Sequence, residues 1–167
     1  MIRLASLADV ASIMNIVRSA QLALRGLDID QWQDGYPTQD IIEADISMGV
    51  GYVACDDNGV VVGYAAIVVD GEPAYHQSEF VEWHTDDDYV VVHRLCVDAS
   101  ARRKGVAVSL MEYAANHARK QGINTFRIDT HEGNIYMRAM LAKLGFEYCG
   151  IVFYPSGKRI GFDLKFD

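Results

Sequence analysis

The stretch YVVVHRLCVDASARRKGVAVSLMEYAANHARKQG, residues 89–122, contains the change of pattern that decides the fold. Its first ten residues are rich in β-branched side chains and predict a central strand over residues 89–98. From residue 106 onward, apolar residues recur at helical spacing, which predicts a helix that ends at Gly122. The segment that joins the two elements holds three basic residues and a glycine: Arg102, Arg103, Lys104 and Gly105.

A helix that begins directly after a glycine-bearing loop is a natural binding site for an anion. The first N–H groups of a helix lack intrahelical partners, and the helix dipole adds positive charge there. Gly105 permits close backbone approach, and the neighbouring basic side chains reinforce the attraction. The motifs GxxxxGK(S/T) and GxGxxG are absent, which excludes two other ways of holding phosphates. The alternative is a solvated helix start that happens to be basic, since short basic clusters are common.

The rest of the chain alternates strand and helix patterns around this stretch. A strand over residues 2–5 precedes a helix that starts near Ser6 or Asp9 and stops at Gly26, and Thr38 caps a second helix that ends before Gly49. The hairpin signal DNG joins strands at residues 51–56 and 60–70, and residues 71–88 read as a polar loop. After the quoted stretch come a strand at 125–130, a helix at 134–145, and strands at 146–154 and 159–166. The order is β-α-α-β-β-β-α-β-α-β-β, which predicts an α/β (α+β) fold with a mixed sheet covered by helices.

Composition narrows the class of protein further. The 167 residues predict a single domain over 1–167, and no apolar run is long enough for a signal peptide or a membrane span. A formal net charge of −8 argues against broad nucleic-acid binding and suits a cationic substrate better. Cys55, Cys96 and Cys149 show no metal-ligand spacing, so we expect reduced thiols in a cytoplasmic protein and no metal site.

Two motifs, taken together and in order, carry a resemblance to a known family. LCVDASARRKGVA places Arg102, Gly105 and Ala107 on the pattern R/Q-x-x-G-x-G/A, and Asn134 opens a helix that ends in KLGF at residues 143–146. In both respects the chain resembles the GNAT superfamily of acetyl-CoA-dependent N-acyltransferases. The resemblance implies a mainly antiparallel central sheet flanked by helices on both faces, and acetyl-CoA (coenzyme A) as cofactor.

The resemblance also implies how the cofactor is held. The loop after the fourth strand wraps the pyrophosphate with backbone N–H groups, while a bulge separates the fourth strand from the fifth and leaves room for the pantetheine arm. Asn134 is a helix cap by position and, in the family, also a cofactor contact. The cofactor-binding residues expected here are Leu95, Cys96 and Val97 on the strand, Arg102, Arg103, Lys104, Gly105, Val106 and Ala107 in the loop, and Asn134.

The implied reaction is transfer of an acetyl group to a primary amine of a small molecule or peptide by direct attack on the thioester. His93 is the candidate base, because one branch of the family carries a histidine on this strand; the alternative is a hydrogen-bonded structural histidine. Many relatives place a tyrosine where this chain has Leu141, so Tyr136 or water is left to protonate the thiolate. The departure also leaves open a non-catalytic module that senses acyl-CoA or acts as an interaction module.

In this family the acceptor is lined by the region of the first two helices and by the loop after the third strand. Aromatic walls with carboxylates suit a cationic amine through cation–π and ion-pair contacts. The alternative is that both tryptophans cap the core. A homodimer is possible, since superfamily members often pair. The candidate acceptor residues are Trp32, Tyr36, Glu82 and Trp83.

Overall fold

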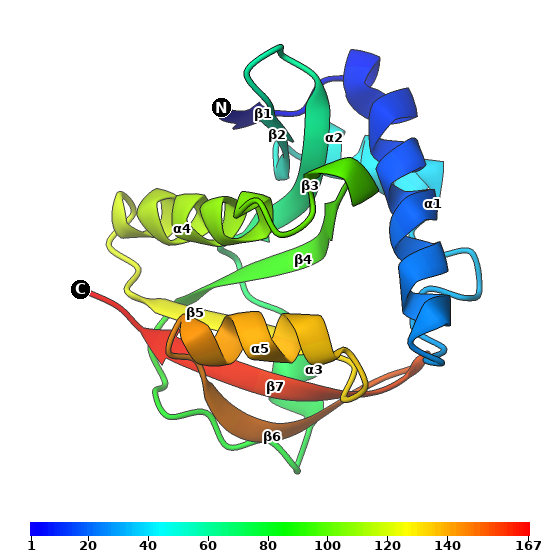
Figure 1. Ribbon diagram of the computed structural model, residues 1–167. Helices are drawn as coiled ribbons and strands as arrows, with labels where there is room; N and C mark the ends of the chain where they lie inside the picture. The colour runs from blue at the N-terminus through cyan, green and yellow to red at the C-terminus, as the bar shows by residue number, and fades with distance from the viewer. The chain divides into compact units, whose positions relative to one another are not determined.

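The computed structural model describes residues 1–167 (Figure 1). Seven strands form one sheet in the order β1-β2-β3-β4-β5-β7-β6. β4 and β5 run parallel, whereas β1–β2, β2–β3, β5–β7 and β6–β7 are antiparallel pairs. The predicted mixed sheet, mainly antiparallel, is confirmed. The strands are β1 (Ile2–Leu4), β2 (Gly51–Cys55), β3 (Val61–Val68), β4 (Tyr89–Val97), β5 (Thr125–Thr130), β6 (Glu147–Tyr154) and β7 (Gly157–Lys165).

The helices follow the predicted order, with one addition. A five-residue helix, α3, lies inside the segment 71–88, where the sequence predicted only a polar loop. It forms because Pro73 occupies the first turn and the Glu72 side chain caps it, accepting from the Ala74 N–H at 3.1 Å. None of the helices combines the length and apolarity that crossing a membrane requires. They are α1 (Val10–Gly26), α2 (Gln39–Ser47), α3 (Pro73–Gln77), α4 (Val106–Arg119) and α5 (Ile135–Lys143), with short 3₁₀ turns η1 (Leu7–Asp9) and η2 (Ala99–Ala101).

The chain divides into two compact units, and β4 and α4 each contribute residues to both. Unit 1 comprises Met1–Ile67 and Val92–Tyr113, and unit 2 comprises Val68–Val91 and Ala114–Asp167. The single domain expected over residues 1–167 stays a prediction.

Unit 1 has a core between its strands and the pair α1 and α2, which pack together (Figure 1). Apolar residues of both helices and of β2, β3 and β4 meet in one buried cluster: Ile13, Ile16, Val17, Ile42, Val53, Cys55, Tyr64 and Cys96. On β3, a Cβ added to Gly63 would lie 2.8 Å from Val106 Cγ1 and 3.3 Å from Leu110 Cδ1. The first turns of α4 therefore pack directly on β3, which fixes where α4 begins.

Unit 2 is built on the ladder of β5, β7 and β6, with side chains alternating between its two faces. α5 lies over one face (Figure 1), where Phe126 and Phe146 pack edge to face with ring centroids 5.2 Å apart. The segment between β3 and β4 contributes to the other face, where an aromatic cluster is buried. Its buried members are Tyr75, Tyr89, Val91 and Val152.

Candidate functional site

The loop between β4 and α4 has a backbone shaped by two left-handed residues. Arg103 has φ of 62° and Gly105 has φ of 80°. The Asp98 N–H donates to the Val62 carbonyl at 2.8 Å, and the Asp98 side chain accepts from the Ser100 N–H at 2.9 Å, so the start of the loop is fixed on β3. The hydrogen bonds from Ser100 lower the pKa of Asp98. Left-handed residues such as Arg103 and Gly105 turn neighbouring backbone N–H groups inward, as in other anion-binding concavities.

The start of α4 is open at its first turn. The helix begins at Val106, and Ser109 donates to the Gly105 carbonyl at 2.9 Å. The N–H groups ahead of Ser109 therefore belong to the turn that has no intrahelical acceptors. A Cβ added to Gly105 would meet nothing within 4 Å, so space lies open beside this glycine. The geometry fits an anion held by backbone N–H groups.

The three basic side chains of the loop have different environments. Arg102 donates from Nη2 to the carbonyl and hydroxyl oxygens of Ser19 on α1, at 3.3 and 3.2 Å. Arg103 and Lys104 are exposed. The loop therefore keeps two solvent-facing cations, while the Arg102 side chain is hydrogen-bonded to α1.

The strand β4 changes character halfway along its length. Its parallel ladder with β5 covers Tyr89–Val91, and Arg94 then has φ of 54°, an unusual conformation for a non-glycine residue in a strand. The structure thus has the irregularity in the fourth strand that the resemblance predicted. Beyond it, the Cys96 side chain enters the core of unit 1, where burial raises its pKa to about 12. The residues on either side of it, Leu95 and Val97, are half-buried.

Arg94 forms a buried ion pair that the sequence analysis missed. It donates from Nε to Asp45 Oδ2 at 2.8 Å and from Nη2 to Asp45 Oδ1 at 2.6 Å, with side chains 14% and 2% exposed. Tyr64 Oη donates to the same carboxylate at 2.6 Å, and Arg94 Nη1 donates to Tyr36 Oη at 2.8 Å. Four residues from α2, β3, β4 and the α1–α2 connection thus form one network around the irregular point of β4.

The network has consistent effects on the pKa values of its members. Burial by itself would lower the pKa of Arg94, but the hydrogen bonds and charge of Asp45 and the contact with Tyr36 outweigh it and raise that pKa. Burial, and then the hydrogen bond to Asp45, raise the pKa of Tyr64. Arg94 is therefore charged and Tyr64 neutral at physiological pH.

A sequence signal for this network existed in α2. Asp45 stands three residues after the fully buried Ile42, on the apolar stripe of the helix. A carboxylate buried at such a position needs a cationic or hydrogen-bonding partner. The partner could not be named from spacing, because Arg94 lies 49 residues away.

Two of the predicted acceptor residues belong to unit 1 and lie together. Trp32 and Tyr36 meet edge to face with ring centroids 6.3 Å apart, and Trp32, at φ of 64°, packs against the core cluster of unit 1. Tyr36 links this pair to Arg94 through its hydroxyl. Trp32 therefore packs on the core, as the alternative interpretation expected, and also stands beside the network.

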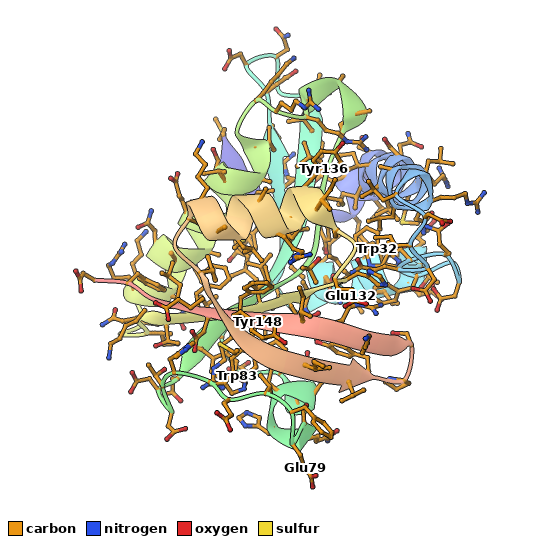
Figure 2. The ribbon with its side chains drawn as sticks, turned by 60° about the horizontal axis from the view of Figure 1, so that its bottom comes forward. Trp32, Glu79, Trp83, Glu132, Tyr136 and Tyr148 are labelled. Atoms are coloured by element: carbon orange, nitrogen blue, oxygen red, sulfur yellow. The ribbon has the colours of Figure 1, made fainter.

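The other two predicted acceptor residues belong to unit 2. Trp83 donates from Nε1 to the Tyr75 carbonyl at 3.2 Å, and the Arg127 guanidinium lies 4.6 Å from its ring centroid. Glu82 is exposed and its N–H donates to the Cys149 carbonyl at 2.8 Å. In Figure 2, Glu79, from the same segment, points away from unit 2. Trp83 is thus held by aromatic packing, and its acceptor role stays a prediction.

The predicted catalytic residues differ in exposure. His93 is half-buried on β4, directly before Arg94. Tyr136 is 62% exposed on the first turn of α5, where Figure 2 shows it projecting away from β6 and β7. Leu141, at the position where many relatives carry tyrosine, is fully buried. Asn134 caps α5, accepting from the Met137 N–H at 3.2 Å, which confirms its predicted capping role.

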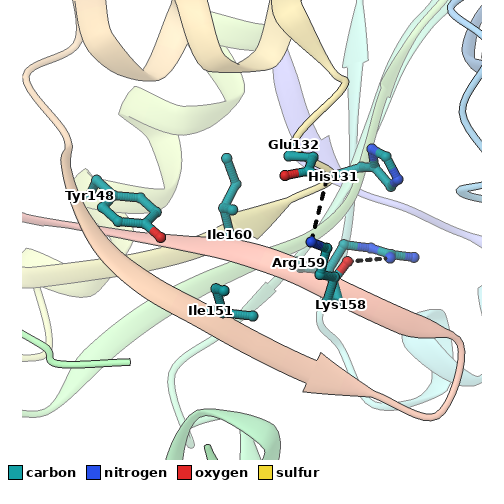
Figure 3. Close-up of a pocket in the computed structure, with 7 residues that line it drawn as sticks. All are labelled: His131, Glu132, Tyr148, Ile151, Lys158, Arg159 and Ile160. Atoms are coloured by element: carbon teal, nitrogen blue, oxygen red, sulfur yellow. Dashed lines mark hydrogen bonds and ion pairs between the residues drawn. The ribbon is translucent and has the colours of Figure 1, made fainter. Parts of the chain in front are cut away.

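Unit 2 also holds a small cavity beside the β6–β7 hairpin (Figure 3). Lys158 Nζ lies 3.6 Å from Glu132 Oε1, and Arg159 Nη1 donates to the Lys158 carbonyl at 2.8 Å. His131 Nδ1 accepts from the Gly133 N–H at 2.9 Å, as a turn residue does. These polar groups are engaged with one another, and we assign the cavity no role. Its lining residues are His131, Glu132, Tyr148, Ile151, Lys158, Arg159 and Ile160.

Comparison with known proteins identifies the class to which this fold and loop belong. A sequence model of the acetyltransferase (GNAT) family matches residues 16–146. The chain belongs to this family. It is 32% identical over 59 residues to GCN5-related N-acetyltransferase 6, chloroplastic, of Arabidopsis thaliana, a match that covers 35% of this chain but only 20% of that protein.

Solved structures agree with the family over the whole chain. A GNAT-family acetyltransferase from Streptococcus agalactiae is 31% identical, with a TM-score of 0.91 over all of this chain and 95% of that one. The PaiA N-acetyltransferase of Thermoplasma acidophilum, in complex with coenzyme A, has the same fold at 15% identity, with a TM-score of 0.76 over 99% of this chain and 98% of that one. The fold and the family predicted from the two motifs are confirmed.

Proposed function

We propose that this protein is an N-acetyltransferase that transfers an acetyl group from acetyl-CoA to a primary amine of a small molecule or peptide. The observation that carries the proposal is the loop ahead of α4, where Arg103 and Gly105 are left-handed and the space beside Gly105 is open. Family membership supplies the cofactor class.

The cofactor's pyrophosphate is assigned to the backbone of the loop. The N–H groups of residues 103–107 offer donors at the positive end of the α4 dipole, and Arg103 and Lys104 add exposed positive charge. Arg102 contributes by fixing the loop to α1 through Ser19. The resemblance adds Asn134 of unit 2 as a further contact.

The backbone of residues 95–97 is assigned to the acyl-bearing end of the cofactor. Bound acetyl-CoA supplies a thioester whose carbonyl oxygen gains negative charge as an amine attacks it. Backbone N–H groups held in a fixed orientation stabilise such charge without reorganisation. The Arg94–Asp45 pair fixes the backbone directly before these residues, so we regard Arg94 as a positioning residue.

Proton transfer is assigned to His93 and, on the leaving group, to Tyr136 or water. The amine must lose a proton as its nitrogen bonds to the carbonyl carbon, and the departing sulfur must gain one as the C–S bond breaks. His93 lies next to the irregular point of β4, and an imidazole is the side chain that enzymes use most often as a general base. Leu141 has no ionisable proton and is fully buried, so it cannot act as the acid.

The acceptor is a cationic amine under this proposal. Trp32 and Tyr36 present aromatic groups, and Glu82 presents an exposed carboxylate, next to Trp83 in sequence. The net charge of −8 favours approach of a cation over an anion. We likewise propose a homodimer and a cytoplasmic location.

The test is an assay of free thiol with acetyl-CoA and a panel of amines, with product identified by mass. We expect acetylated amine and stoichiometric thiol for at least one cationic amine. His93→Gln should lower kcat at least about 100-fold, within the range that general bases contribute, and leave the KM for acetyl-CoA near that of the parent chain. His117→Gln, on α4, is the matched control. A kcat in His93→Gln equal to that of the parent chain at every pH would exclude His93 as the base.

A second candidate function is a non-catalytic acyl-CoA sensor or interaction module. It is favoured by the buried Leu141 and by the exposure of Tyr136, which leave the leaving group without an evident protein acid. Calorimetry with acetyl-CoA, combined with the amine assay, separates the acetyltransferase from the sensor. Tight binding of acetyl-CoA with no acetylated product from any amine supports the sensor, and turnover excludes it.

A further inference from the structure

Three potential metal ligands converge in unit 2, on residues that acyl transfer does not use. His84, Cys149 and Asp163 each offer one ligand atom, and these atoms all lie within 4.8 Å of one another. His84 Nδ1 is 2.7 Å from Asp163 Oδ1 and 3.5 Å from Cys149 Sγ. The two ligands on the sheet are buried, whereas the His84 side chain is 49% exposed. A solvated ion could therefore enter from the histidine side.

The sheet itself brings Cys149 and Asp163 to one face. Glu147 and Asp163 are direct partners across β6 and β7, and the register shifts between Tyr148 and Gly150, so that Cys149 is the extra residue of a bulge. A bulge re-aims the side chain it carries. Here it directs the thiol toward the Asp163 carboxylate, whose charge adds to the effect of burial in raising the pKa of Cys149.

The carboxylate is oriented before any ion arrives. The backbone N–H of His84 donates to Asp163 Oδ2 at 2.7 Å, which leaves Oδ1 directed at the imidazole. His84 Nε2, on the far side of the ring, lies 3.6 Å from Glu147 Oε2. When an ion binds Nδ1, the ring keeps its proton on Nε2, where the Glu147 carboxylate stabilises it, as is usual for metal-bound histidines.

We propose that His84 Nδ1, Cys149 Sγ and Asp163 Oδ1 form a three-ligand site for a thiophilic divalent cation, zinc above all. Nitrogen, thiolate and carboxylate are the ligands that zinc prefers, and their usual bond lengths put tetrahedral ligands about 3.4–3.6 Å apart. The separation of His84 Nδ1 and Cys149 Sγ meets this value. The shorter separation between His84 and Asp163 is that of a hydrogen bond, and the exposed histidine can move outward by the required fraction of an ångström.

Zinc in this site would fasten the segment after Trp83 to the β6–β7 hairpin. On binding to the imidazolium form, the ion displaces the Nδ1 proton that His84 shares with Asp163, and this proton passes to solvent together with the thiol proton of Cys149, while Nε2 keeps its own. Water completes the fourth position, which faces the exposed side of His84. The site rests on unit 2 alone and is independent of the proposed acyl transfer.

Cobalt(II) is the probe, because a cobalt–thiolate bond gives a charge-transfer band in the near ultraviolet and four-coordinate cobalt absorbs strongly in the visible. Untagged full-length protein, reduced and freed of metal by a chelator, is titrated with cobalt and then with zinc. We expect one cobalt per chain with both features, and loss of both as zinc replaces it. Absence of the charge-transfer band in the parent chain would overturn the proposal, whether or not the protein acetylates amines.

Variants assign the ligands. Cys149→Ser should abolish the charge-transfer band, and His84→Gln, at a side chain that is 49% exposed, should reduce cobalt affinity at least tenfold. Glu147→Gln should weaken binding by about tenfold, because it removes the charge that stabilises the proton on His84 Nε2. Cys55→Ser is the matched control, because that thiol is buried in unit 1. An unchanged cobalt affinity in His84→Gln, or loss of the charge-transfer band in Cys55→Ser, would refute the assignment. In thermal melts, equal stabilisation of the parent chain and of His84→Gln by zinc would also refute it.

Discussion

Two segments of this chain, β4 to α4 and β5 to α5, both connect a strand to a helix, but they differ in backbone conformation and in how the helix begins. In the first, Arg94, Arg103 and Gly105 all have positive φ, and the helix starts directly after a glycine. In the second, all six residues of β5 pair with β7, and no residue from Ile123 to Leu144 has positive φ. Asn134 then caps α5 with its own side chain.

The difference shows where a fold sets aside donors for a ligand. The helix start at α5 satisfies one of its N–H groups internally and so offers less to an anion. The start at α4 is left open, and the irregular conformations that open it cost free energy that the surrounding contacts must offset. Those contacts are the ion pair at Arg94 and the hydrogen bonds of Asp98 and Arg102. Three substitutions test this contrast.

Removing the charge of Asp45 should have the largest effect. Asp45→Asn leaves the Arg94 guanidinium in a buried site without a counter-charge, and breaking one partner of such a pair typically costs about 3 kcal/mol or more. In a chain of this size each kcal/mol shifts Tm by roughly 2–4 °C, so a fall of about 6–12 °C is expected in thermal melts. Asp40→Asn, at an exposed position of the same helix, is the control. A fall in Tm no larger than in this control would mean that the network does not stabilise the irregular strand.

Closing the open helix start should have the next largest effect. Gly105→Asp introduces a side chain at φ of 80° and a negative charge where the phosphates are proposed to lie. We expect coenzyme A affinity to fall about 100-fold by calorimetry, which corresponds to about 2.7 kcal/mol. Gly122→Asp is a close control, because Gly122 follows the end of the same helix at φ of 78° and also has nothing within 4 Å of its missing Cβ. Equal coenzyme A affinity in the two variants would contradict the assignment of the loop.

The sequence predicts the patterned part of this contrast. Apolar periodicity, glycine punctuation and the two motifs place every strand, α1, α2, α4 and α5, and the loop that opens α4, because each depends on residues close together in the chain. The short helix α3 was missed because Pro73 and Glu72 sit in an otherwise polar segment. A five-residue helix carries too little periodicity to predict.

The interactions missed are the ones that join distant residues. Arg94 and Asp45 are separated by 49 positions in the sequence, and Cys149 and His84 by 65, so local spacing cannot predict either contact. The prediction of no metal site uses the spacing of the cysteines alone, and spacing tests only ligands that are neighbours in sequence, whereas the site proposed above joins distant residues. For the acceptor residues the difficulty is similar, since Trp32 and Trp83 lie in irregular segments whose conformation depends on tertiary packing.

The smallest effect is expected at the capped helix start. Asn134→Ala removes the acceptor of the Met137 N–H and should lower the free energy of unfolding by about 1 kcal/mol, measured by chemical denaturation. Thr38→Ala is the control, because Thr38 occupies the same position on α2 but makes no side-chain cap bond, so its effect should stay within about 0.5 kcal/mol. The proposed cofactor contact of Asn134 adds a second measurement. If the side chain only caps α5, the KM for acetyl-CoA stays unchanged in Asn134→Ala. If this KM rises in Asn134→Ala but not in Thr38→Ala, the Asn134 amide serves both the helix and the cofactor.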